Sequence, residues 1–202
     1  MSRASTVAEA GHGYIAFNDT IREVRSDGPA AAAIVVEPNA APVGACTEVR
    51  PRSATQAYAV CGRRLVELGS GAVRVIDAAE TALDLWTDAS NDVWLVRASG
   101  ALEQRRGSDG ALVRAYEGFA GTTFTEIVGT SNTNLWALAS DGALARFDGS
   151  AWAPVRLPRT DPSSRLAVTP TDAWVFMNSA PWAIYRVNAA GAVSSVPSLS
   201  GA

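Results

Sequence analysis

The strongest constraint on the fold is a short pattern that recurs roughly every 40 residues. Three clear copies place a tryptophan inside an apolar run that follows a polar turn, at 91–96 (NDVWLV), 133–138 (TNLWAL) and 171–176 (TDAWVF). Two weaker copies, around 12–16 and 56–60, carry tyrosine instead. The repeated aromatic residues are Tyr14, Tyr58, Trp94, Trp136 and Trp174, separated by 44, 36, 42 and 38 residues. This period indicates a repeat architecture, and a β-rich unit of about 40 residues is the size of one four-stranded propeller blade.

The fourth copy shows how one repeat would be built. Apolar runs at 124–129, 135–139, 143–147 and 152–157 are separated by short polar turns. The Asp141-Gly142 pair is a hairpin signal, because glycine readily adopts the positive φ that a tight turn requires. The second run is apolar at nearly every position, which is typical of a strand that is covered on both faces. The sequence therefore predicts four strands per repeat.

Five such repeats account for most of the 202 residues, and helix signals are almost absent. We therefore expect an all-β protein, a five-bladed β-propeller of four-stranded antiparallel blades that forms a single domain over residues 1–202. The blades are expected at approximately 4–40, 41–80, 81–120, 121–160 and 161–200, with the repeated aromatic residues packed between them. The alternative is that five blades belong to a larger propeller.

The chain has two cysteines, Cys46 and Cys61. If the surrounding segments pair as a hairpin centred between Ser53 and Ala54, the two cysteines face each other and can form a cross-strand disulfide. The alternative is two buried thiols. A disulfide would favour a compartment outside the cytoplasm, whereas the first six residues contain no hydrophobic targeting core, so a cytoplasmic location stays open.

Charge and hydropathy narrow the kinds of partner. The formal net charge is −3, and all 17 basic residues are arginines spread along the chain, so no nucleic-acid partner is predicted. No stretch of about 18 apolar residues occurs, so no membrane insertion is predicted.

Residues 90–96 (SNDVWLV) and 140–152 (SDGALARFDGSAW) resemble a known type of repeat. They are similar to the D-V-W-x-V blades of bacterial secreted and surface propellers, which are related in style to sialidase-type and tachylectin-like repeats. The resemblance covers the third to fifth repeats. It departs from WD-type repeats, and Asp148–Trp152 matches only a fragment of the sialidase box. The resemblance implies an extracytoplasmic binding or scaffold domain, although fold analogy alone does not define a function.

Few residues suggest catalysis. The only histidine, His12, is expected in a turn, and nothing nearby completes a catalytic triad. No zinc spacing, phosphate-binding loop or calcium motif occurs, so no metal and no cofactor is predicted. Asp84 and Glu126, at matching places on two inner strands, are the best pair of carboxylates for glycoside hydrolysis. The alternative is that they bind water in the channel.

Binding residues are expected on the propeller face formed by two sets of loops, those between second and third strands and those between consecutive blades. The candidates on this face are Asn18, Asp19, Arg63, Arg97, Asp141, Asn178 and Trp182. Trp182 follows the insertion Ala180-Pro181 and is the aromatic side chain best placed to stack on a sugar or contact a peptide. The leading hypothesis is a non-catalytic propeller that binds a protein or cell-surface partner. A carbohydrate-binding lectin is the alternative, and a hydrolase of the sialidase or glycosidase type is the third hypothesis.

Overall fold

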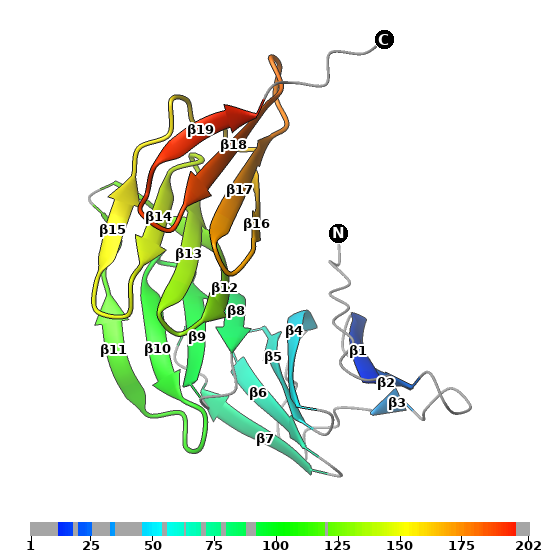
Figure 1. The fold of residues 1–202 in the computed structure, drawn as a ribbon. Coiled ribbons are helices and arrows are strands. Elements are labelled where there is room, and N and C mark those ends of the chain that lie inside the picture. The colour runs from blue at the N-terminus through cyan, green and yellow to red at the C-terminus, as the bar shows by residue number, and fades with distance from the viewer. Residues whose placement is uncertain are drawn as a thin grey trace. The chain divides into compact units, whose positions relative to one another are not determined.

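The structure, a computed structural model, consists of β-strands, turns and loops over the residues that it describes (Figure 1). It describes residues 12–17, 20–25, 33–34, 46–53, 56–62, 64–69, 72–77, 80–87, 92–119 and 121–196. Over these ranges we find no helical segment with the length and hydrophobicity needed to span a bilayer. The chain divides into two compact units, Met1–Ala98 with Glu103–Ala115, and Ser99–Leu102 with Tyr116–Ala202.

The first unit contains three antiparallel sheets. Leu102 and Tyr116, which are end residues of two strands of the third sheet, belong to the second unit. The first sheet is formed by β1 (His12–Phe17), β2 (Thr20–Arg25) and β3 (Ala33–Ile34). The second sheet is formed by β4 (Cys46–Ser53), β5 (Gln56–Cys61), β6 (Arg64–Gly69) and β7 (Ala72–Asp77). The third sheet is formed by β8 (Ala82–Thr87), β9 (Asp92–Arg97), β10 (Leu102–Arg106) and β11 (Leu112–Tyr116). His12 is thus the first residue of a strand, which corrects its expected place in a turn.

The second and third sheets pack face to face within the first unit. One buried cluster joins Tyr58, Val60 and Leu65 of the second sheet to Leu85, Val93 and Leu95 of the third. Tyr58 is fully buried, and its hydroxyl donates a hydrogen bond to the carbonyl oxygen of Gly107 in the β10–β11 turn, at 3.2 Å. Burial raises the pKa of this phenol above its usual value. The repeated aromatic residue therefore connects one sheet to the next.

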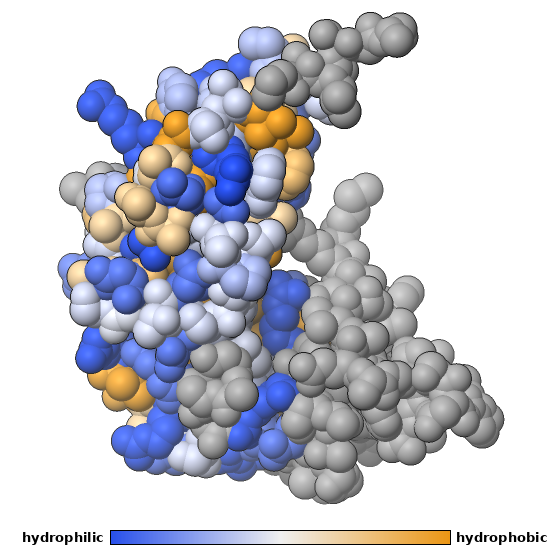
Figure 2. Space-filling model, viewed as in Figure 1, coloured by the Kyte–Doolittle hydropathy of each residue, from blue (hydrophilic) through white to orange (hydrophobic). Residues whose placement is uncertain are grey.

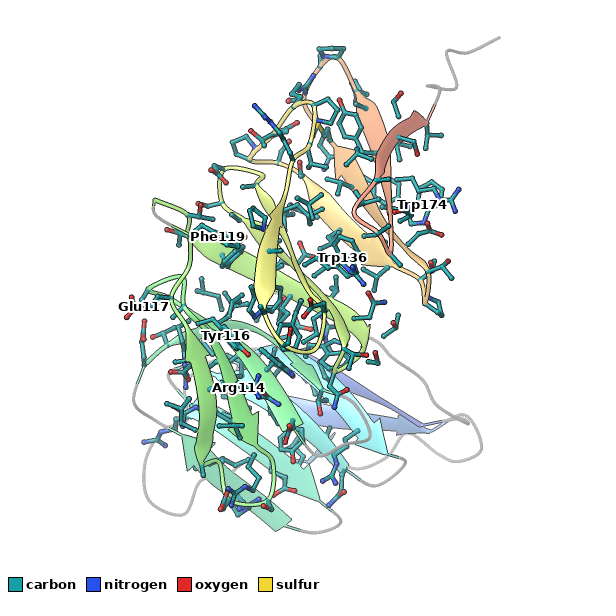
Figure 3. The ribbon with its side chains drawn as sticks, turned by 60° about the vertical axis from the view of Figure 1, so that its left-hand side comes forward. Arg114, Tyr116, Glu117, Phe119, Trp136 and Trp174 are labelled. Atoms are coloured by element: carbon teal, nitrogen blue, oxygen red, sulfur yellow. A yellow bond between two sulfur atoms is a disulfide. The ribbon has the colours of Figure 1, made fainter. Side chains whose placement is uncertain are left out.

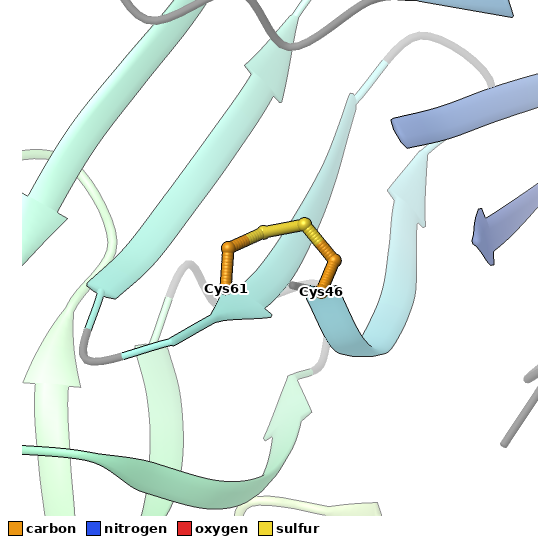
Figure 4. Close-up of a disulfide and its surroundings, with 2 residues drawn as sticks. All are labelled: Cys46 and Cys61. Carbon is orange, nitrogen blue, oxygen red and sulfur yellow. A yellow bond between two sulfur atoms is a disulfide. The ribbon is translucent and has the colours of Figure 1, made fainter. Parts of the chain in front are cut away.

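The disulfide between Cys46 and Cys61 joins β4 to β5 (Figure 4). The two cysteines are cross-strand partners, as the sequence predicted. The predicted hairpin centre was wrong by one residue, because Ser53 pairs with Gln56. Two register irregularities, between Cys46 and Glu48 and between Pro51 and Ser53, bring the cysteines opposite each other again.

The second unit contains two complete four-stranded sheets. The fourth sheet is formed by β12 (Phe124–Ser131), β13 (Asn134–Ala139), β14 (Leu144–Phe147) and β15 (Trp152–Val155). The fifth sheet is formed by β16 (Arg165–Val168), β17 (Asp172–Met177), β18 (Ala183–Asn188) and β19 (Val193–Val196). In both sheets the strands follow chain order, so each sheet is an antiparallel meander.

The fourth and fifth sheets share a buried core. Trp136, Leu138 and Leu144 of the fourth sheet lie in one cluster with Leu166, Ala173, Val175, Met177, Tyr185 and Val187 of the fifth. Trp136 is only 1% exposed, and burying a side chain of this size stabilises the contact by about 2 kcal/mol or more. A second aromatic group packs on the outer part of the fourth sheet, where Trp152 lies 5.4 Å from Phe147 and 6.4 Å from Tyr116, ring centre to ring centre.

A polar residue opens the second strand of each of the last three sheets, and it has a structural partner in each. Asp92 accepts a hydrogen bond from the side-chain amide of Gln104 at 2.6 Å, and Asn134 accepts one from the indole of Trp136 at 3.1 Å. Asp172 accepts two from the guanidinium of Arg186, at 2.9 and 3.0 Å. In the third and fifth sheets the polar residue therefore ties the second strand to the third, whereas Asn134 orients the indole of Trp136 within its own strand.

Candidate functional site

Three loops of the second unit come together at one end of the fourth and fifth sheets. They are the β13–β14 turn (140–143), the β15–β16 connection (156–164) and the β17–β18 loop (178–182). Gly142 lies so close to the backbone of Asp161 that a Cβ atom would be 2.4 Å from its nitrogen and 2.5 Å from its oxygen. The amide of Asn178 donates to the carbonyl oxygen of Ser163 at 2.9 Å. We call these three loops the loop face.

Asp161 is the organising residue of the loop face. Its side chain is buried, and its two carboxylate oxygens accept hydrogen bonds from two serines in different loops. Ser163 donates from its backbone nitrogen at 2.8 Å and from its hydroxyl at 2.7 Å, and Ser179 donates from its nitrogen at 2.8 Å and from its hydroxyl. These bonds, above all the one from the Ser179 hydroxyl, hold the pKa of Asp161 well below its usual range. A charged carboxylate therefore ties the β15–β16 connection to the β17–β18 loop.

Arg159, in the β15–β16 connection, also binds the β17–β18 loop. Its guanidinium donates to the carbonyl oxygen of Pro181 at 2.8 Å and to the carbonyl oxygen of Ser179 at 3.0 Å. The hydroxyl of Ser179 accepts a further bond at 2.9 Å, and the Asp161 carboxylate lies at 3.5 Å. Because a guanidinium has several donors in a rigid plane, one arginine satisfies several acceptors of an irregular loop.

Trp182 stands at the end of this fixed loop. It follows Pro181, whose peptide bond to Ala180 is cis, and its side chain is 73% exposed. Among the described residues no other large apolar side chain is as exposed. An aromatic side chain held on a rigid loop loses little conformational entropy when it contacts a ligand.

The structure brings three of the predicted binding residues to the loop face. Asp141 is exposed, and its carboxylate accepts a hydrogen bond from the backbone of Ala143 at 2.9 Å, which holds the β13–β14 turn. Asn178 and Trp182 lie in the β17–β18 loop. The other candidates Asn18, Asp19 and Arg63 lie outside the described residues. Asp161 and Arg159 were missed, although the sequence Asp161-Pro162-Ser163 carries a turn signal.

Arg97 is a correction to the predicted site. Its side chain is 1% exposed, and its guanidinium binds the carboxylate of Glu103 at 2.6 Å and the carbonyl oxygen of Glu80 at 2.9 Å. Such a buried charge has to be paired, because an uncompensated one would be costly. Arg97 therefore acts within the first unit and is not presented to a ligand.

The predicted acidic pair lies in two different units. In the first unit Asp84 is 4% exposed, accepts a hydrogen bond from the backbone nitrogen of Leu85 at 2.9 Å, and lies 3.8 Å from the guanidinium of Arg50. Arg50 also pairs with Glu48 at 3.0 Å. These contacts give Asp84 a structural role between β4 and β8. Glu126 occupies the equivalent register position in the second unit, so the catalytic pairing stays a prediction. Over the described ranges no three acidic, histidine or cysteine side chains gather as a metal site.

The architecture defines the class of protein. Four-stranded antiparallel meanders follow one another along the chain, and the first strands of consecutive sheets are in contact, β4 with β8 and β12 with β16. Each pair of sheets so related is packed face to face through a repeated aromatic residue. This is a β-propeller built from four-stranded blades.

Solved structures share this fold at low sequence identity. YCF48 bound to D1 peptide is similar with a TM-score of 0.71 and 14% identity, over 95% of this chain and 65% of that one. PorZ, a bacterial surface component of the type-IX secretion system of Porphyromonas gingivalis, gives a TM-score of 0.70 and 15% identity, over 96% and 28%. The WD40 β-propeller domain of Doa1 gives 0.68 and 14%, over 85% and 59%. This chain therefore spans 65% of the length of the YCF48 chain and smaller shares of the other two, 59% of Doa1 and 28% of PorZ. No family model matches the sequence, and no curated protein is similar to it.

Proposed function

We propose that this protein is a non-catalytic β-propeller that binds a protein partner through the loop face. The observation that carries the proposal is the exposed Trp182 on a loop held by Asp161 and Arg159. Tryptophan is enriched among the residues that dominate protein interfaces. The loop beneath it is fixed before any partner arrives, so little ordering cost opposes binding.

The similarity to solved propellers also supports a protein partner. YCF48, whose fold this chain shares, has been solved bound to D1 peptide, which supports a peptide or protein partner for this chain. On this chain the loop face offers one exposed apolar ring, and the same group of loops carries the polar side chains of Asn178 and Asp141. That combination suits a short peptide segment with one large apolar side chain and flanking polar backbone.

The test is peptide selection with matched variants. The purified chain is used to select from a displayed random-peptide library, and the affinities of the selected peptides are measured for wild type, Trp182→Ala and Leu112→Ala. Leu112 is the control because it is also exposed, 52%, but lies on β11. Losing a hot-spot tryptophan costs about 2 kcal/mol or more, which is roughly a thirtyfold weaker affinity. Peptides that bind Trp182→Ala as well as wild type would refute the proposal.

A lectin is the second candidate, since an exposed indole on a loop that also carries Asn178 suits a sugar ring as well. Binding to a glycan array that disappears in Trp182→Ala, together with no selected peptide, would favour it. A hydrolase is the third, and glycosidase activity abolished by Asp84→Asn or Glu126→Gln would establish it instead.

We further propose that the five sheets are blades of one propeller domain, either five-bladed or part of a larger one, of the bacterial D-V-W-x-V type. An extracytoplasmic location is part of this proposal. The Cys46–Cys61 disulfide supports it, because disulfides persist in oxidising compartments. The similarity in fold to a surface component of a secretion system agrees with it.

A further inference from the structure

Arg146, on β14 of the fourth sheet, is a cation that has no counter-ion among the described residues. Its guanidinium lies over the indole of Trp136, its cross-strand neighbour, at 5.5 Å from the ring centre. No hydrogen bond or ion pair joins the guanidinium to any described residue, and its Nε is enclosed without an acceptor. A guanidinium is always charged in proteins, so this positive charge is available to an anion.

The neighbouring sheets show how this place is filled when both partners come from the chain itself. In the fifth sheet Arg186 lies in the same way over Trp174, at 5.9 Å. The carboxylate of Asp172 accepts hydrogen bonds from the Nε of Arg186 at 2.9 Å and from one of its Nη atoms at 3.0 Å. Figure 3 shows the tryptophans of the fourth and fifth sheets. In the third sheet the carboxylate of Asp92 likewise accepts from the amide of Gln104 on the neighbouring strand, at 2.6 Å.

The fourth sheet has no carboxylate at this position. Asn134 is the first residue of the second strand, as Asp172 is in the fifth sheet. Its side-chain oxygen accepts a hydrogen bond from the indole of Trp136 at 3.1 Å, and its amide donates to the hydroxyl of Thr130 at 2.8 Å. An amide carries no charge, so Asn134 leaves the positive charge of Arg146 unbalanced.

The guanidinium of Arg146 is both accessible and oriented. The residue is partly exposed, and of its guanidinium nitrogens only the Nε is enclosed without a partner, so the Nη groups can be reached from solvent. Figure 2 shows hydrophilic residues among hydrophobic ones at the surface over the fourth and fifth sheets. Contact with the indole face restricts the plane of the guanidinium, and its Nη groups match the two oxygens of a carboxylate.

We propose that Arg146 is a binding site for a carboxylate from outside the chain. Carboxylate is the class of anion because the same protein supplies one to the equivalent arginine of the fifth sheet, with two hydrogen bonds. Such charge-assisted bonds are stronger than neutral ones. The site is separate from the loop face, whose loops follow the last residues of β13 and β17, because Arg146 pairs with Trp136 toward the beginning of β13.

The first measurement follows the nitrogen-15 signals of the arginine side chains while sodium acetate is added to the purified chain. Sodium chloride at the same ionic strength is the reference. The Arg146 signal is identified by its loss in Arg146→Gln, and we expect it to shift to saturation with acetate but not with chloride. Arg156→Gln is the matched control, since it removes the same charge from an exposed arginine in the β15–β16 connection and should leave the titration unchanged.

A second variant supplies the missing partner inside the chain. Asn134→Asp places a carboxylate where Asp172 stands in the fifth sheet, so the Arg146 signal should no longer respond to acetate. This variant keeps Arg146 and therefore tests the site even if Arg146→Gln does not fold.

The second measurement asks whether the carboxylate belongs to a partner protein. A displayed random-peptide library is selected on Trp182→Ala, which lacks the exposed tryptophan of the loop face. Selected peptides are expected to contain Asp or Glu, and adding Arg146→Gln should weaken them at least about tenfold, because a hydrogen-bonded charge pair is lost. Since Trp182 is absent from this chain, the result does not depend on the function proposed for the loop face.

The two measurements separate the sources of the carboxylate. Saturation with acetate supports a small free ligand, and acidic peptides that depend on Arg146 support a protein partner. Equal shifts with acetate and chloride, together with no selected peptide that depends on Arg146, would overturn the proposal. An acetate response that persists in Asn134→Asp would overturn it as well, because an internal carboxylate has to compete for the same guanidinium.

Discussion

The loop face depends on close approach between the β13–β14 turn and Asp161, and Gly142 tests that approach. Gly142 has φ of +85°, and Gly191 has φ of +81° in the β18–β19 turn. The backbone N–H of each glycine donates a hydrogen bond to the carbonyl oxygen three residues earlier, with a nitrogen–oxygen distance of 2.9 Å. The two glycines differ in their surroundings, because a Cβ at Gly191 would have no atom within 4 Å.

The alanine variants should therefore differ in stability. In Gly191→Ala the only cost is the strain of the left-handed backbone conformation, which lowers the free energy of unfolding by about 1 kcal/mol for a residue with a Cβ. Gly142→Ala carries the same strain and also pushes against Asp161, and forced overpacking adds about 1–3 kcal/mol. Urea unfolding followed by circular dichroism should give Gly142→Ala a free energy of unfolding lower by about 2–4 kcal/mol, against about 1 for Gly191→Ala. Equal losses for the two variants would refute the contact between the turn and Asp161.

Four further outcomes follow from the same contacts. Replacing both Cys46 and Cys61 with serine should lower the free energy of unfolding by about 3 kcal/mol, the expected value for a 15-residue separation, and a reductant should do the same to wild type. Glu103→Gln should cost about 3 kcal/mol in urea unfolding, because it leaves the buried Arg97 without its carboxylate. Trp136→Ala should cost about 3–5 kcal/mol and Trp182→Ala almost nothing, measured side by side. The pKa of Asp161 is lowered in the folded state, so the ionised carboxylate stabilises the fold fully above the unfolded pKa of about 4, and this stabilisation is lost as the pH falls. The difference in unfolding free energy between wild type and Asp161→Asn should therefore be smaller at about pH 3 than at neutral pH.

The repeat gave a good prediction of the strands, because its signals are local. A polar turn, an apolar run with one aromatic residue and a turn glycine are adjacent in sequence, and each restricts the backbone where it stands. Trp94 and Trp136 are buried in the second strand of their sheets for this reason.

Positions that depend on distant partners were harder to predict. The bulges in β4 have no sequence signal, so the hairpin centre was misplaced although the cysteine pairing was correct. Arg97 follows an apolar run in the sequence, which suggested an exposed loop, but it is the last residue of β9 and pairs with Glu103 while buried. The importance of Asp161 comes from Ser179, 18 residues away, and nothing in the local sequence of either residue indicates that contact.

The central claim is that successive β-sheets cover one another through the repeated aromatic residue. The most direct test is a nuclear Overhauser experiment on protein with labelled methyl groups, recorded for the Trp136 indole. The account predicts cross-peaks to methyl groups of the fifth sheet, from Val175, Met177 or Val187, which share its buried cluster. An indole of Trp136 that shows cross-peaks only to residues of its own sheet would contradict it.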